Sequence, residues 1–152
     1  PIFEDVIKRC EEGVKFIIDP AKIDPGDNIE ENQVNFRELL LQCVNAIYNA
    51  QETMPESLIY VSQIIYRKVF DKVGDFAYNI LSSFLFLRFI IPSFSATQMV
   101  GLPPLLPDKP RAVLLQVSTV IMSSILKGKL DEKGEHLAPF NDIAKQTQDM
   151  FL

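Results

Sequence analysis

Apolar residues recur along this chain at the spacing of amphipathic helices. The clearest stripe runs over Phe36, Leu40, Cys43, Val44 and Ile47, the positions i, i+4, i+7, i+8 and i+11. This spacing places all five side chains on one helix face. No stretch combines strict alternation of apolar and polar residues with the turn chemistry of a hairpin. The sequence therefore predicts an all-α fold of about six helices.

Capping residues and helix breakers mark where these helices begin. Asn28 precedes the stripe described above and is a favoured N-cap residue. Thr53 is predicted to cap the next helix, with Pro55 in its first turn, where a missing N–H costs nothing. Gly74 then opens a helix that extends to about residue 91. That helix is apolar on all sides from Phe84 onward, so we expect residues 74–91 to form a buried central helix.

Composition and charge narrow the classes of protein. The chain has 152 residues, of which 47% are hydrophobic and 23% charged, as expected for one compact domain or most of one. Its net charge of −5 and the lack of a Lys/Arg-rich run argue against a nucleic-acid partner. The apolar run before Pro92 is shorter than the ~20 residues of a membrane-spanning helix. We therefore predict a cytoplasmic protein without direct membrane insertion.

The chain offers little chemistry of its own. His136 is the only histidine, which excludes multi-histidine metal sites, and the six glycines form no phosphate-binding motif. Cys10 and Cys43 lie at apolar positions without a CxxC motif and are predicted to be reduced. We expect no cofactor, no metal and no self-contained active site.

Arg88 departs from this pattern, because it lies within the apolar run 84–91. A buried arginine is very costly unless it is paired. Its side chain must either reach the surface or bind acceptors, and the planar guanidinium suits the fixed binding of carbonyls or carboxylates. Two interpretations remain open. In the first, Arg88 snorkels to the surface or pairs with a local acid to stabilise the fold. In the second, it emerges at a groove and organises a site there.

Four segments in order resemble the domain of Ras GTPase-activating proteins (RasGAPs). Residues 86–93 (Phe-Leu-Arg-Phe-Ile-Ile-Pro-Ser) resemble the family signature FLR-F-x-x-PA, and residues 16–22 its hydrophobic-DP-x-K turn. Residues 30–33 are followed by an amphipathic helix and then by the run Met-Pro-Glu-Ser-Leu at residues 54–58. This order resembles the family's segment that leads into its P-x-x-L-R helix. Residues 137–142 resemble a late segment that ends in Asn-Asp.

The resemblance implies that residues 1–152 are the C-terminal portion of a single RasGAP-like domain, which binds a Ras-family small GTPase in its GTP form and stimulates hydrolysis. Such a domain regulates an enzyme and is not one itself. The catalytic finger arginine belongs to the family's N-terminal half, which would precede Pro1. Arg88 would brace the finger loop as a secondary arginine. Any recruitment to a membrane would come from other domains.

The resemblance also implies which residues contact the GTPase. Two positions at which this sequence differs from the family's pattern bear on activity. The family's A-K-x-hydrophobic-Q segment falls on residues 118–122, where its lysine is Thr119 and its glutamine Met122. The alternative is therefore a scaffold module with the same fold that binds a GTPase without stimulating it. The expected GTPase-binding residues are Phe86, Leu87, Pro92, Gln116, Thr119 and Ser123.

Overall fold

The regular secondary structure of residues 2–152, the range that the computed structural model describes, is entirely helical. This confirms the predicted all-α fold. The seven α-helices in this range exceed the six expected, because the run predicted as one central helix is divided by a π-helical turn. The α-helices are α1 (Ile2–Glu11), α2 (Ile29–Asn49), α3 (Glu56–Val73), α4 (Ala77–Leu85), α5 (Ile91–Ser95), α6 (Asp108–Ile125) and α7 (Asn141–Phe151), and the shorter turns are η1 (Ala50–Thr53), η2 (Gly74–Phe76), η3 (Phe86–Ile90), η4 (Thr97–Val100) and η5 (Glu135–Phe140).

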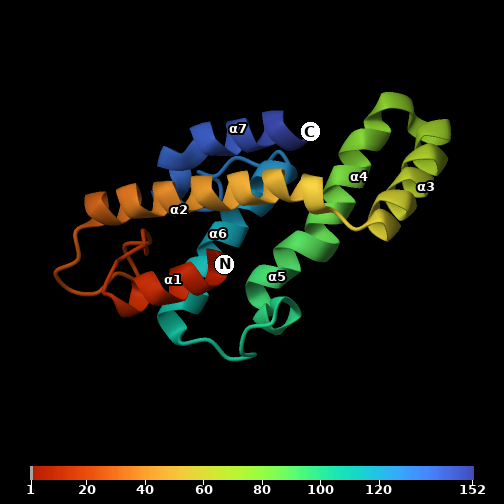
Figure 1. The fold of residues 1–152 in the computed structure, drawn as a ribbon. Coiled ribbons are helices and arrows are strands. Elements are labelled where there is room, and N and C mark those ends of the chain that lie inside the picture. The colour runs from red at the N-terminus through yellow and green to blue at the C-terminus, as the bar shows by residue number, and fades with distance from the viewer. Residues whose placement is uncertain (1) are drawn as a thin grey trace.

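The most buried helix is α6, whose inner face includes Leu114, Val117 and Ile121. It packs against α1, α2, α5 and α7, so neighbours cover most of its circumference. Figure 1 shows α2 and α7 lying side by side, with α6 crossing behind them. The aromatic pair Phe36 and Phe140, with ring centroids 5.1 Å apart, joins α2 to the start of α7.

The expected burial of residues 74–91 is not observed in the described chain and needs correction. Of this run, Ala77 and Phe86 are buried, whereas Phe84 and Phe89 are exposed. The physical reason is the number of neighbours. The run packs against α3 on one side and against α6 and Phe151 of α7 on another, and several of its other apolar side chains remain exposed. Apolar composition on all sides thus did not bring neighbours on all sides.

Helices α3 and α4 form a hairpin that projects from the other helices, as Figure 1 shows. The turn lies at Gly74, where φ is +61°, a conformation that glycine adopts without steric cost. By length and apolar composition alone, the stretch Glu56–Ser95 could cross a membrane, a criterion that core helices of soluble proteins also meet. In this structure the stretch turns back on itself at Gly74.

The helix starts were predicted with mixed success. Asn28 caps α2 as expected, and its Oδ1 accepts hydrogen bonds from the backbone N–H groups of Glu30 and Glu31. The prediction for Thr53 is wrong: its hydroxyl donates to the carbonyl of Ala50 inside η1, and Pro55 occupies the N-cap of α3. A threonine hydroxyl can satisfy a nearby carbonyl as readily as a helix N-terminus.

Residues 12–28 form an irregular segment that amide side chains hold in place. The Nδ2 of Asn32 donates to the carbonyl of Ile17 at 2.8 Å, and the Nδ2 of Asn35 donates to that of Lys15 at 3.0 Å. From α6, the Nε2 of Gln116 donates to Phe16 O at 3.0 Å, and its Oε1 accepts from the N–H of Ile18 at 3.3 Å. These contacts satisfy backbone groups that no regular element pairs.

Arg37 fastens α2 to the junction of η5 and α7. Its guanidinium donates to Asp142 Oδ2 at 2.6 Å and to the carbonyl of Pro139, and it stacks over the ring of Phe140 at 5.3 Å. One side chain therefore joins segments about one hundred residues apart. The hydrogen bond from Arg37 is also the largest cause that holds the pKa of Asp142 below its usual value.

We predict that Arg37→Ala lowers the free energy of unfolding by about 1–2 kcal/mol, because charge-assisted hydrogen bonds and a cation–π contact are lost together. Thermal and urea unfolding monitored by circular dichroism would measure the change. Arg111→Ala is the matched control, since its 2.7 Å bond to Asp108 joins neighbours on one exposed helix surface and should cost less than about 0.5 kcal/mol. Equal effects of the two substitutions would contradict the fastening role of Arg37.

Candidate functional site

The segment Phe86–Ile90 is a π-helical turn between α4 and α5. The N–H of Ile91 donates to the carbonyl of Phe86, five residues back, which is the π-helical pattern. Pro92 follows and has no N–H, so the carbonyl of Arg88 loses the donor that an α-helix would supply. Single π-helical turns of this kind occur frequently at functional sites.

The turn directs Phe86 and Arg88 to different environments. Phe86 is 4% exposed, and its ring packs edge-on against Phe151 of α7 with centroids 4.9 Å apart. Arg88 is exposed and makes no hydrogen bond or ion pair within residues 2–152. Local pairing of Arg88 is therefore not observed, and its exposure fits both snorkelling to the surface and a site there. All five N–H donors of its guanidinium are available to a partner.

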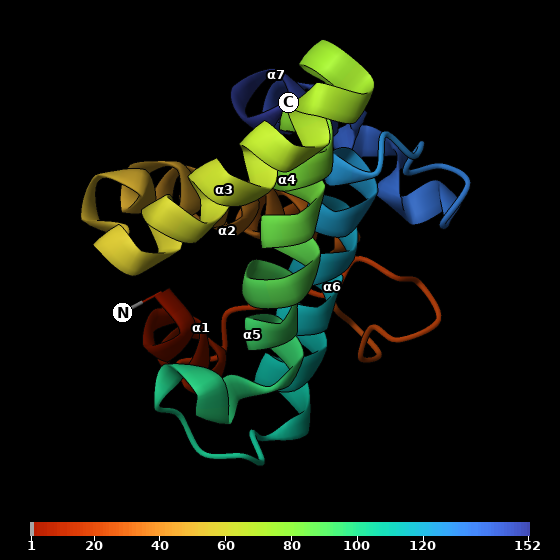
Figure 2. The same ribbon diagram turned by 90° about the vertical axis from the view of Figure 1, so that its right-hand side faces the viewer.

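Helix α6 lies beside this turn, as Figure 2 shows. Beyond its first turn, one stripe of accessible side chains runs at the spacing i, i+4, i+8 and i+11 from Arg111 to Met122, exposed at its first two positions and partly exposed at the last two. Leu115 within this stripe is 42% exposed, and Leu87 on the turn is 37% exposed. The exposed leucines and the unpaired arginine thus lie on neighbouring helices at the surface.

A pocket of about 520 Å³ lies along α6, between that helix, the 12–28 segment and η5. We call it the basic pocket, because Lys22, Arg111, Lys133 and His136 contribute to its lining. The predicted residues Gln116 and Thr119 also line it. Gln116 is held by the two backbone contacts described above, and the Thr119 hydroxyl donates to the carbonyl of Leu115 at 2.9 Å.

The predicted site residues therefore occupy unequal positions. Leu87 and Arg88 are exposed, Thr119 and Gln116 line the basic pocket, and Pro92 is half-buried in the first turn of α5. Phe86 and Ser123 are buried, so their side chains do not reach the surface of the described chain. The Ser123 hydroxyl, at 2% exposure, has no hydrogen-bond partner there.

Sequence reasoning missed the basic pocket. Its cations come from three segments: Lys22 from the 12–28 segment, Arg111 from α6, and Lys133 from the loop that precedes η5. No local motif joins residues so far apart. The one available signal was Lys22, which ends the turn that resembles the family's D-P-x-K segment.

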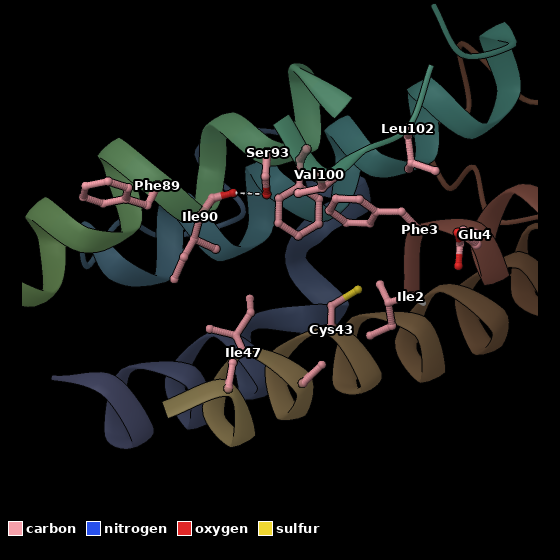
Figure 3. A pocket seen from close by; sticks show the side chains of 13 residues that line it. Ile2, Phe3, Glu4, Cys43, Ile47, Phe89, Ile90, Ser93, Val100 and Leu102 are labelled. Carbon is pink, nitrogen blue, oxygen red and sulfur yellow. Dashed lines mark hydrogen bonds between the residues drawn. The ribbon is translucent and has the colours of Figure 1, made fainter. Parts of the chain in front are cut away.

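The opposite side of the turn borders an apolar cavity of about 420 Å³, shown in Figure 3. Phe89 and Ile90 line it from the turn, and Phe3 and Ile47 line it from α1 and α2. The Ser93 hydroxyl donates to the carbonyl of Ile90 at 2.6 Å, so it supplies a partner for a backbone group just before the proline. On this side the turn therefore faces an apolar cavity, whose other walls include α1 and α2.

Asp24 ties the 12–28 segment to α6 through an exposed ionic network. Its Oδ2 accepts from Lys109 Nζ and from Lys15 Nζ, each at 2.9 Å. These two hydrogen bonds, that of Lys109 first, lower the pKa of Asp24 to about 2. The carboxylate is thus charged at any physiological pH, and the network fixes one wall next to the basic pocket.

We predict that this network stabilises the protein in a pH-dependent way. Since the folded pKa of about 2 lies below the unfolded value of about 3.9, the contribution is complete above pH 4 and is lost as the pH falls towards 2. Asp24→Asn should therefore lower the melting temperature by about 1–2 °C at pH 7 and have a much smaller effect at pH 2. Differential scanning calorimetry against Asp149→Asn on α7 would check this, and a difference of undiminished size at pH 2 would contradict it.

Comparison with known proteins finds a matching family and several relatives. The family described as GTPase-activator protein for Ras-like GTPase matches residues 4–125 of the chain. Ras GTPase-activating protein 2 of Mus musculus is 28% identical over 111 residues, which cover 71% of this chain and 13% of that protein.

Two further relatives also resemble this chain at low identity and over a small part of their own length. Ras GTPase-activating protein 1 of Rattus norvegicus is 22% identical over 159 residues, which cover 98% of this chain and 15% of that protein. The probable Ras GTPase-activating-like protein ngap of Dictyostelium discoideum is 31% identical over 106 residues, which cover 68% of this chain and 11% of that protein. The chain thus spans between 11% and 15% of the length of these three relatives.

Proposed function

Because the chain belongs to the family of GTPase-activator proteins for Ras-like GTPases, we propose that it binds a Ras-family small GTPase in its GTP-bound form and promotes GTP hydrolysis. The observation that carries this proposal is the exposed, unpaired Arg88 on a π-helical turn that adjoins α6. An arginine with five uncommitted donors suits the binding of a loop that arrives from elsewhere.

In this proposal Arg88 acts as a positioning residue. Its guanidinium holds backbone carbonyls of the loop that carries the finger arginine, so that the finger can enter the GTPase active site. Such a finger stabilises the charge that develops on the phosphate oxygens in the transition state. The rigid support of the π-helical turn, through Phe86 and Phe151, keeps the Arg88 backbone in place.

Of the other predicted residues, some contact the GTPase and the rest support the residues that do. Leu87, Pro92 and Thr119 form the surface that the GTPase covers, and Gln116 fixes the neighbouring segment through its two backbone contacts. Phe86 and Ser123 act from beneath this surface, since both are buried.

We further propose that the chain supplies the C-terminal portion of the domain, residues 1–152, while a preceding segment carries the finger arginine. The protein is then a regulator of an enzyme. Its net charge of −5 disfavours nucleic acid as a partner. It acts in the cytoplasm without a cofactor or direct membrane insertion, and other domains provide any recruitment to membranes.

A GTPase-binding scaffold without activating function is the second candidate. The specific observation that favours it is Thr119, which stands where the family has a lysine and whose hydroxyl is bonded to the carbonyl of Leu115. A single-turnover GTP hydrolysis assay of the full-length protein with a panel of Ras-family GTPases separates the two candidates. Binding of the GTP form without acceleration would establish the scaffold.

We predict that Arg88→Ala in the full-length protein slows stimulated GTP hydrolysis by about 10- to 100-fold, because a misplaced finger loses transition-state contacts. Affinity for the GTP form should change much less. The melting temperature should stay within about 1 °C, because Arg88 is exposed and unpaired in the described chain.

Arg67→Ala is the matched control for Arg88→Ala, since Arg67 is exposed on α3. It should leave hydrolysis, affinity and melting temperature unchanged. If Arg88→Ala also left hydrolysis unchanged in a protein that accelerates it, the positioning role would be excluded. A loss of stability that parallels the loss of rate would instead assign Arg88 a structural role.

A further inference from the structure

The basic pocket concentrates positive charge on an acidic protein. Lys22, Arg111 and Lys133 carry permanent positive charges, and Asp19 and Asp108 are the carboxylates of the lining. The lining therefore has one net positive charge, without counting His136, whereas the whole chain has −5. Three separate segments of the chain bring these cations together.

The three cations differ in their pairing. Lys22 Nζ lies 3.2 Å from Asp19 Oδ2, and Arg111 donates to Asp108 Oδ1 at 2.7 Å. The Lys133 side chain makes no hydrogen bond or ion pair within residues 2–152. Lys133 is thus the one lysine or arginine of this pocket that has no ion pair within residues 2–152.

Part of the pocket lining is apolar. Ile17, Leu115 and Leu137 contribute to it, and Leu137 is buried in the core. The contacts of Gln116 with Phe16 and Ile18 hold the wall formed by the 12–28 segment. A volume of about 520 Å³ admits one or two side chains of a partner.

We infer that the basic pocket receives an acidic side chain of the bound GTPase, together with an adjacent apolar side chain, and that Lys133 forms the ion pair. This inference rests on the proposed function. The pocket shares Arg111, Leu115 and Thr119 with the exposed stripe of α6, so a partner that lies on that stripe also covers the pocket.

The charges of the pocket favour one carboxylate over a polyanion. Asp19 and Asp108 already pair with two of the three cations, and both would repel a nucleic-acid or lipid-phosphate array. Donation from the N–H of Ala21 is the largest cause that lowers the pKa of Asp19, which therefore remains charged at neutral pH. A single carboxylate beside Lys133 meets less of this repulsion than a polyanion does, and an apolar neighbour fits the apolar part of the lining.

The test is Lys133→Glu in the full-length protein, with association measured by stopped-flow fluorescence against Ras-family GTPases loaded with a non-hydrolysable GTP analogue. We expect affinity to fall about tenfold, mainly through a slower association rate, with a larger effect at low salt. Lys133→Gln should give an intermediate loss. Lys145→Glu on α7 changes the net charge equally, lies outside the pocket, and should change affinity less than twofold.

The outcomes separate this inference from the function on which it rests. If Lys133→Glu and Lys145→Glu had equal effects while wild-type protein bound the GTPase, the ion pair would be excluded and the proposed function would stand. If no GTPase of the panel bound the wild-type protein, both would be overturned. A loss of affinity in Lys133→Gln that came with a lower melting temperature would assign Lys133 to the fold and overturn the inference.

Discussion

The packing of α6 among α1, α2, α5 and α7 is the constraint on which the other features depend. Small residues allow this close approach, and they bring hydroxyl groups into the core. Ser124 donates to the carbonyl of Val120, and Ser118 donates to that of Leu115, so these hydroxyls are satisfied within the helix itself. With α6 fixed, the π-helical turn has a rigid neighbour on one side, and the basic pocket has a rigid wall on the other.

Much of the fold was predictable because its causes are local. The stripe of α2, its cap at Asn28 and the break at Gly74 each follow from a few adjacent residues. The outward position of Arg88 could also be anticipated as one of two alternatives, because an unpaired guanidinium cannot remain inside. Burial of the run 74–91 could not be predicted in the same way. It depends on how many elements pack around the run, which local composition does not determine.

The candidate site, too, was predictable only where the cause lies in adjacent residues. The sequence identified the segment around Arg88, since an arginine within an apolar run is a local anomaly. It did not identify the basic pocket, whose cations Lys22, Arg111 and Lys133 lie in three segments that only the fold brings together. Nor did it distinguish Phe86, which is buried against Phe151, from the exposed Leu87 next to it.

The π-helical turn also has a consequence for how this segment can vary. A π-helical turn takes up one residue more than the corresponding α-helical path, so α4 and α5 keep their relative rotation despite the extra residue. Deletion of one residue between Phe86 and Ile90 would restore an α-helical path and leave the faces of α4 and α5 against their present neighbours. A second deletion would instead turn one helix by about 100° relative to the other, so the segment can lose one residue but not two.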